Sequence, residues 1–263
     1  MKAPRVISGF HAVQARLRAE SSSVIEIFLD EDRADARARD LVALAKIHGV
    51  KLMRVPGARL DGLQAGRAHQ GVVARVEDTS RRISLDDLLD ALAGPALLLV
   101  LDGVTDPHNL GACLRVADAA GAHAVIAPKD RAAGIGTTVS KVASGAAESL
   151  PYYMVTNLAR TIDELKERNI WIVGADERAP ATLYEAQLPD SIAWVLGAEG
   201  EGMRRLTRER CDTLVKIPML GSVASLNVSV ASGICLFESR RRRLGAGSPE
   251  HQKPEYAAQK EAR

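Results

Sequence analysis

From residue 96 onward the sequence alternates between short apolar segments and amphipathic helical segments, and this alternation is its strongest constraint on the fold. Residues 96–101 (ALLLVL) form an uninterrupted apolar run, as in a strand buried on both faces of a parallel sheet. Such alternation predicts a parallel sheet covered by helices on both faces. We expect further strands at 123–127, 152–155, 170–175, 192–197 and 213–217, and helices at 109–120, 137–147, 158–168, 203–210 and 226–243.

Residues 1–77 predict a separate, smaller α/β domain. Helices are expected at 8–19 and 33–48, and strands at 24–29, 51–55 and 71–76. Residues 78–94 predict a linker, because they are polar, hold one short helix and end at Gly94-Pro95. The larger domain then spans 95–245. Residues 246–263 contain few large apolar side chains, so we expect a disordered tail.

The charge distribution is mildly uneven. Residues 1–77 contain 13 Lys and Arg against 9 Asp and Glu, a net charge of +4, although the whole chain carries only +2. A basic N-terminal domain fits a polyanionic partner such as nucleic acid, and a chance distribution explains the same numbers equally well.

The sequence gives no sign of a metal centre, a secretion signal or a membrane span. Cys113, Cys211 and Cys235 lie far apart and form no C-x-x-C pair. No apolar run follows Met1, and none approaches the roughly 20 residues that a membrane span needs. We therefore expect a cytoplasmic protein with reduced thiols and no bound metal.

Three loops follow predicted strands of the larger domain and are rich in glycine and polar residues. They lie in the segments 101–122, 195–203 and 217–238. Ligands of parallel α/β sheets bind beyond the carboxyl ends of the strands, so these loops are candidates for a ligand site.

The polar residues of the first two loops have both a functional and a structural interpretation. Asn109 is placed to cap a helix, and Arg115 lies six residues later, near the helix N-terminus, where an anion could bind. The alternative is a plain capping residue and a solvated arginine. Glu199 lies between Gly197 and Gly200, which could admit a ligand to the backbone, or it could simply complement a helix dipole.

The third loop enters the last helix. Ser225 is a natural N-cap, and Asn227 then falls in the first turn, where asparagine is a poor helix former. A polar residue kept at an unfavourable position indicates a ligand contact. The basic run at 240–243 matches the negative end of the same helix dipole.

Taken together, the three segments resemble the three motifs of the SpoU branch of the SPOUT methyltransferases. The matching patterns are N-L-G-x-x-x-R at 109–115, G-A-E-G-x-G at 197–202 and S-L-N-V-S-V-A at 225–231. The segments 7–17 (ISGFHAVQARL) and 69–76 (HQGVVARV) resemble the RNA-binding domain of this branch, which is similar to ribosomal protein L30e. The resemblance implies an α/β fold with a C-terminal trefoil knot, and a homodimer.

The resemblance also implies an activity, which is transfer of a methyl group from S-adenosylmethionine to a ribose 2′-hydroxyl of RNA. In this family the arginine that matches Arg115 is often described as the base. Because a guanidinium stays protonated, we expect Arg115 to act instead as a fork that holds phosphate and stabilises a developing oxyanion. Glu199 would orient Arg115 or accept a proton through water. The implied catalytic residues are Asn109, Arg115, Glu199, Ser225 and Asn227, and the implied cofactor-binding residues are Gly197, Gly202, Ile217, Met219, Leu226 and Asn227.

The combination with the N-terminal domain implies a substrate in 23S ribosomal RNA, either free or in an assembling large subunit. The expected target is the guanosine at position 2251, in the peptidyl-transferase region. A tRNA ribose methyltransferase of the same branch is one alternative, and the N-terminal domain argues against it. A non-catalytic RNA-binding protein of ribosome assembly is the other, and the complete set of polar motif residues argues against that.

Overall fold

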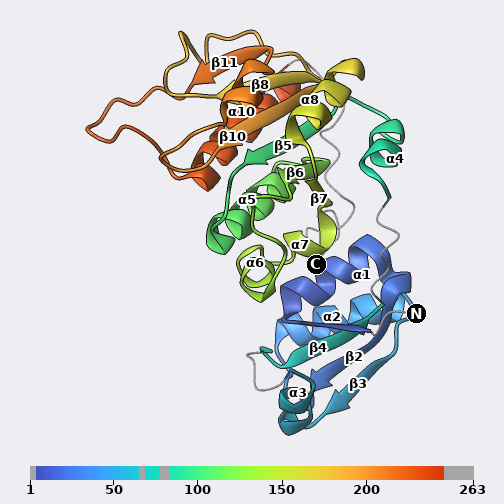
Figure 1. The fold of residues 1–263 in the computed structure, drawn as a ribbon. Helices are drawn as coiled ribbons and strands as arrows, with labels where there is room; N and C mark the ends of the chain where they lie inside the picture. The colour runs from blue at the N-terminus through green and yellow to red at the C-terminus, as the bar shows by residue number, and fades with distance from the viewer. Residues whose placement is uncertain (1–3, 65–68, 78–82, 246–263) are drawn as a thin grey trace.

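The computed structural model describes residues 4–64, 69–77 and 83–245, and within them the chain forms two sheets (Figure 1). The predicted tail at 246–263 and the first part of the predicted linker, 78–82, lie outside the described residues. No helix in the described ranges is long and apolar enough to cross a membrane.

The first sheet has four strands in the order β1-β4-β2-β3. Strand β4 is antiparallel to both β1 and β2, whereas β2 and β3 are parallel. The sequence did not predict β1, which has only four residues, or α3, whose two glycines lower helix propensity. The elements are β1 (Arg5–Ser8), α1 (Phe10–Glu20), the 3-10 turn η1 (Ser21–Ser23), β2 (Val24–Asp30), α2 (Ala36–Ile47), β3 (Leu52–Val55), α3 (Gly57–Gln64) and β4 (Val72–Val76).

The second sheet has seven strands in the order β7-β6-β5-β10-β8-β11-β9, and every pair in it is parallel. The parallel α/β prediction is therefore confirmed. The two-residue β9 gave no apolar run that could have predicted it. The strands are β5 (Leu97–Asp102), β6 (Ala124–Pro128), β7 (Tyr152–Val155), β8 (Trp171–Ala175), β9 (Ala181–Thr182), β10 (Ile192–Gly197) and β11 (Thr213–Lys216).

Helices cover both faces of this sheet and create two cores. Alternate residues of the fully buried β5 point into each core: Leu99 packs with α5 and α10, and Val100 packs with α8. The helices are α4 (Leu85–Asp90), α5 (Pro107–Ala119), α6 (Thr137–Val142), α7 (Ala146–Ser149), α8 (Leu158–Glu167), α9 (Arg205–Glu209) and α10 (Val228–Gly245).

The segment 137–147 was expected to be one helix but forms two, α6 and α7, because two residues between them have left-handed backbone dihedral angles. Ser144 has φ 51° and Gly145 has φ 99°. A Cβ at 145 would lie 2.8 Å from the carbonyl oxygen of His11, so the break lets α1 of the first sheet pack closely against α7. An ion pair between Arg5 and the buried Glu148 joins the same two parts of the chain.

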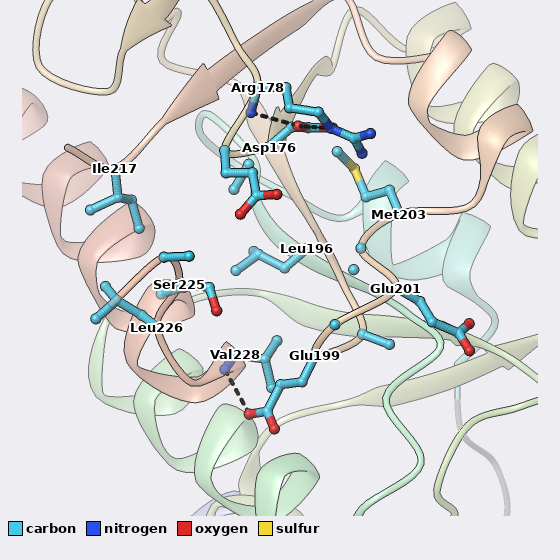
Figure 2. A pocket seen from close by; sticks show the side chains of 18 of the residues that line it. Asp176, Arg178, Leu196, Glu199, Glu201, Met203, Ile217, Ser225, Leu226 and Val228 are labelled. Carbon is cyan, nitrogen blue, oxygen red and sulfur yellow. Dashed lines mark hydrogen bonds and ion pairs between the residues drawn. The ribbon is translucent and has the colours of Figure 1, made fainter. Parts of the chain in front are cut away.

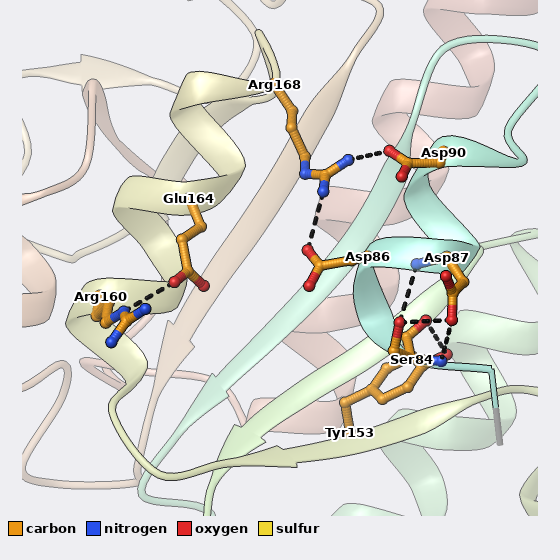
Figure 3. Close-up of polar contacts among 8 residues, drawn as sticks. All are labelled: Ser84, Asp86, Asp87, Asp90, Tyr153, Arg160, Glu164 and Arg168. Atoms are coloured by element: carbon orange, nitrogen blue, oxygen red, sulfur yellow. Dashed lines mark hydrogen bonds and ion pairs between the residues drawn. The ribbon is translucent and has the colours of Figure 1, made fainter.

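The second half of the predicted linker packs on the larger sheet (Figure 3). Ser84 and Asp87 form a capping box at the start of α4, and Leu88 is buried in a core of the larger sheet. Arg168, beyond the end of α8, bridges Asp86 and Asp90. Residues 83–94 therefore belong structurally with the larger domain.

The basic run at the end of α10 binds neighbouring segments of the chain, in addition to lying at the negative end of the helix dipole. Arg240 donates to the carbonyl oxygens of Ala120 and Gly121, just after α5. Arg242 donates to carbonyl oxygens of 183, 184 and 186, and Arg243 to those of 96 and 190. The predicted trefoil knot concerns chain threading, which strand order does not address, and it stays a prediction.

Candidate active site at the carboxyl edge of the sheet

A pocket lies where β8, β10 and β11 end, between the turn at 198–203 and the loop that leads into α10 (Figure 2). All three predicted loops reach this edge of the sheet. Of the predicted site residues, the pocket walls contain Gly197, Glu199, Gly202, Ile217, Met219, Ser225 and Leu226.

Glycines shape the turn that forms one wall. A Cβ at 197 would lie 2.0 Å from the backbone carbon of Gly202, so no other residue fits there. Gly200 and Gly202 have φ of 80° and 70°, which favour glycine. The turn is closed by a hydrogen bond from the Gly202 N–H to the Ala198 carbonyl, at 2.9 Å. These glycines were expected to let a ligand approach the backbone, and the structure shows that the turn itself requires them.

A buried carboxylate fixes this turn to the centre of the sheet. Asp102 ends β5 and is 1% exposed. It accepts hydrogen bonds from the backbone N–H of Arg204 at 2.9 Å and from the Arg204 Nε at 2.6 Å. The wall of the pocket is therefore tied to the strand that precedes the first motif.

Three predicted residues, one from each motif, meet beside the pocket. Glu199 Oε1 accepts hydrogen bonds from Asn109 Nδ2 at 3.2 Å and Asn227 Nδ2 at 2.6 Å. It also accepts one from the Val228 N–H at 3.3 Å, as Figure 2 shows. Asn227 Nδ2 also donates to Asn109 Oδ1 at 2.9 Å. We call these three side chains the amide–carboxylate cluster.

The capping residues differ from those predicted. Asp106 caps α5 by accepting from the His108 N–H at 3.0 Å, with Pro107 at the first helical position, so Asn109 lies in the first turn. Asn227, rather than Ser225, lies at the start of α10, and its Oδ1 accepts from the Ser229 N–H at 2.9 Å. Both asparagine and serine cap helices well, so sequence alone could not choose between them.

Arg115 stands apart from the cluster. It is exposed on α5, and no hydrogen bond or ion pair joins it to any described residue. Glu199 binds the two asparagines, and no hydrogen bond or ion pair joins it to Arg115, so the structure does not show the first of its two expected roles, which was to orient Arg115. Arg115 is therefore a free cation on the helix that carries Asn109.

Three charged residues that follow β8 were not predicted from the sequence. Asp176, Glu177 and Arg178 line the pocket opposite the amide–carboxylate cluster. Asp176 accepts from the Arg178 N–H at 2.9 Å and from the Arg208 Nε at 2.8 Å. The same strand-end argument that selected the three loops applied to residues 176–178, but this loop lacks their glycines. The described residues contain no group of three or more His, Cys, Asp or Glu that could hold a metal.

The pKa of Asp176 is lowered from its ordinary value of 3.8. Burial by itself would raise this pKa, because it disfavours the charged form. The hydrogen bonds from Arg178 and the charges of Arg208 and Arg178 outweigh burial and hold the carboxylate ionised.

A parallel α/β sheet with a glycine-walled pocket and an amide–carboxylate cluster at its carboxyl edge defines the class of α/β methyltransferases that the three motifs resemble. Residues 96–237 match the SpoU rRNA Methylase family, and residues 6–81 match the family described as RNA 2'-O ribose methyltransferase substrate binding. The chain belongs to the SpoU rRNA methylase family.

Relatives match over almost the whole chain. The 23S rRNA (guanosine-2'-O-)-methyltransferase RlmB of Ralstonia nicotianae is 60% identical over 92% of this chain and 98% of its own. Among solved structures, an RNA 2'-O ribose methyltransferase is 29% identical with a TM-score of 0.72, covering 92% of this chain and 90% of its own. The SpoU methyltransferase AviRb of Streptomyces viridochromogenes, solved in complex with AdoMet, is 26% identical with a TM-score of 0.72, covering 92% and 91%.

The buried carboxylate of Asp176 predicts a pH-dependent contribution to stability. Its pKa is lower in the folded state, so its contribution is complete above the unfolded value of 3.8 and disappears as the pH falls through the folded value. Asp176→Asn should lower the free energy of unfolding at pH 7 by about 1.5–3 kcal/mol, the range for hydrogen bonds to charged groups. Urea unfolding at pH 7 and pH 3 measures this, with the exposed Asp130→Asn as control. An equal loss at both pH values would contradict it.

Proposed function

We propose that this protein transfers a methyl group from S-adenosylmethionine to the 2′-hydroxyl of a guanosine in 23S ribosomal RNA. The observation that carries the proposal is the amide–carboxylate cluster, in which one polar side chain from each of the three motifs meets beside a pocket. The named activity of the relative that is 60% identical supports the same reaction and substrate.

The pocket has the chemistry that S-adenosylmethionine needs. Ile217, Met219 and Leu226 offer apolar and thioether surface for an adenine ring, and Gly197 and Gly202 keep the opposite wall thin. Four carboxylates, those of Asp176, Glu177, Glu199 and Glu201, line the space against one guanidinium, that of Arg178. The excess of negative charge favours a ligand that carries a sulfonium and an ammonium group. When bound, this cofactor supplies the electrophilic methyl group. Asn227 would contact it from the start of α10.

The cluster can hold the ribose and accept its proton. Glu199 Oε1 is occupied by three donors, whereas Oε2 makes no hydrogen bond to a described residue. A ribose hydroxyl or a bridging water can therefore donate to Oε2, and the proton leaves the hydroxyl in that direction. Asn109 and Asn227 fix the carboxylate, and Ser225 adds a hydroxyl at the pocket wall. Arg115 would bind phosphate with its planar fork.

The N-terminal domain supports ribosomal RNA as the substrate over tRNA. We propose an RNA-binding domain at 1–77 and a methyltransferase domain at 95–245, with residues 83–94 of the predicted linker 78–94 packed on the methyltransferase domain. Residues 6–81 match a substrate-binding family. Position 2251 remains the target that we propose, in free RNA or an assembling large subunit, and such a substrate places the enzyme in the cytoplasm. A purely non-catalytic assembly protein would not require the complete cluster.

Mapping of the methylated nucleotide tests the function directly. Purified protein is incubated with methyl-labelled S-adenosylmethionine and an unmodified 23S rRNA transcript, and ribose methylation is located by resistance of the RNA backbone to alkali. We expect one labelled ribose, at guanosine 2251. If the label appears in a tRNA transcript and not in 23S rRNA, the substrate is tRNA. If the protein binds the cofactor but transfers no methyl group, the non-catalytic alternative is favoured.

Arg115→Lys tests the fork role, because lysine keeps the charge but loses two parallel hydrogen bonds. Single-turnover methylation should slow by about 2–4 kcal/mol in the barrier, the scale of one lost oxyanion donor. Affinity for S-adenosylmethionine should change little, because a guanidinium would repel the sulfonium and should face the RNA. The control is Arg160→Lys on α8. Near-normal turnover of Arg115→Lys would exclude the fork role and show that Arg115 contributes only its positive charge.

We also propose a homodimer, with α10 in the interface. Val230, Phe237 and Leu244 are 50%, 48% and 42% exposed and recur every seven residues on one face of this helix. Such a row packs well against a symmetry-related copy of itself, and the resemblance to the family implies a second copy.

Phe237→Glu should therefore weaken the dimer, because it buries a charge in an apolar contact. Light scattering across a concentration series should show a dimer for the wild type and a shift toward the monomer for the variant. Ile47→Glu, on the exposed end of α2, is the matched control, since Ile47 is 77% exposed in the other domain. A monomeric wild type, or an unchanged mass for the Phe237 variant, would exclude α10 as the interface.

A further inference from the structure

A group of five residues at one end of the N-terminal sheet takes no part in the proposed reaction. Arg33 follows β2, Phe10 begins α1, and His69, Gln70 and Gly71 directly precede β4. Because β4 runs antiparallel to β1 and β2, these segments meet at the same end of the sheet. We call the five residues the Arg33 corner.

The guanidinium of Arg33 is held in a fixed plane. Its Nη2 donates to the Gln70 carbonyl at 2.8 Å, and its Nη1 donates to Asp35 Oδ2 at 2.6 Å. Its central carbon lies 5.6 Å from the centroid of the buried Phe10 ring. Gly71 gives it room, since a Cβ there would lie 2.8 Å from the Arg33 Nε. The side chain is nevertheless 40% exposed, so part of this ordered plane faces solvent.

Gln70 has a backbone conformation that favours glycine, with φ 53°. Its neighbour His69 locks the turn, with Nδ1 accepting from the Gly71 N–H and Nε2 bonded to Asp61, both at 3.0 Å. The Gln70 side chain is exposed, and its amide makes no hydrogen bond to a described residue. The amide end of the side chain lies over Gly9, where a Cβ would be 3.6 Å from Gln70 Oε1, so its polar atoms remain available to a ligand. A left-handed backbone in a residue with an unused amide makes Gln70 a candidate functional residue.

We propose that the Arg33 corner binds an unpaired base of the RNA substrate. Guanidinium planes stack on unstacked RNA bases, and an amide offers both a donor and an acceptor to a base edge. The inference rests on the proposed function, because it takes an RNA substrate as given. It adds to that function a base-recognition site in the N-terminal domain.

The position of the corner allows one RNA to contact both domains. Phe10 begins the helix that packs on α7, and the His11 carbonyl lies against Gly145 (Figure 1). The neighbouring α6 packs on Gly111 of α5, one turn from Arg115. Only two short helices therefore separate the corner from the helix that carries Asn109 and Arg115.

Gln70→Gly tests the proposal without damaging the fold, because glycine adopts this backbone conformation freely. With full-length protein and a 23S rRNA transcript as the probe, RNA affinity should fall by about fivefold or more, as expected for a lost base contact. The melting temperature should stay the same or rise, and the Kd for S-adenosylmethionine should stay within about twofold. Arg33→Lys, which keeps the charge but loses the plane, should weaken RNA binding to a similar extent.

Asn169→Gly is the matched control. Asn169 also has a left-handed backbone, with φ 58°, and an exposed side chain, but it lies between α8 and β8. RNA affinity equal to wild type in Gln70→Gly, or an equal loss in Asn169→Gly, would overturn the proposal. If only the variants in the Arg33 corner lose RNA affinity, and the protein transfers no methyl group, the base-binding site is supported and the proposed reaction is refuted. If Gln70→Gly methylates normally and keeps its RNA affinity, the reaction is supported and the base-binding site is refuted.

Discussion

The pairing of β5 with β10 at the centre of the larger sheet determines where the site can form. Both strands are buried, and their register sets Gly197 opposite Asp102, so the strands end at the same level. From that point one chain segment leads to Asn109 and the other to Glu199, and the Asp102–Arg204 contact holds them together. A slip in this register would separate residues that are 90 positions apart in sequence but share a hydrogen bond.

The residues of the amide–carboxylate cluster serve structure and chemistry at once. Asn227 starts α10 through its Oδ1 and holds Glu199 through its Nδ2, so one amide uses its two ends for two purposes. Glu199 in turn accepts from the first N–H of α10. A side chain that already orders a helix end pays little additional entropy when it also positions a reacting group. This arrangement explains how an exposed loop can present a rigid carboxylate.

Elements that are determined by their own residues could be predicted from the sequence. Elements that are determined by contacts with distant parts of the chain could not. The apolar run of β5 has one explanation, and its placement was correct. The break at Gly145 exists because α1 passes close to it, and no pattern in 137–147 carries that information. By contrast, the sequence did contain the signal that makes Asp106 rather than Asn109 the cap of α5, because Pro107 follows Asp106 directly and proline is common at the first helical position. The meeting of the three motif loops at one edge was predicted, but the hydrogen bonds of Glu199 to Asn109 and Asn227 were not. Asp176 was not selected, because its loop matches no motif.

The arginines at the end of α10 have a consequence for how the enzyme comes into being. The start of this helix completes the cluster, and its far end grips α5, the chain after β9 and the beginning of β5. Ribosomes make the N-terminal parts first, so every other wall of the site exists as polypeptide before the element that closes it. A nascent chain on its ribosome, surrounded by ribosomal RNA, therefore lacks an assembled site until residues 228–245 have emerged. Packing of the last helix is therefore the step that completes the site.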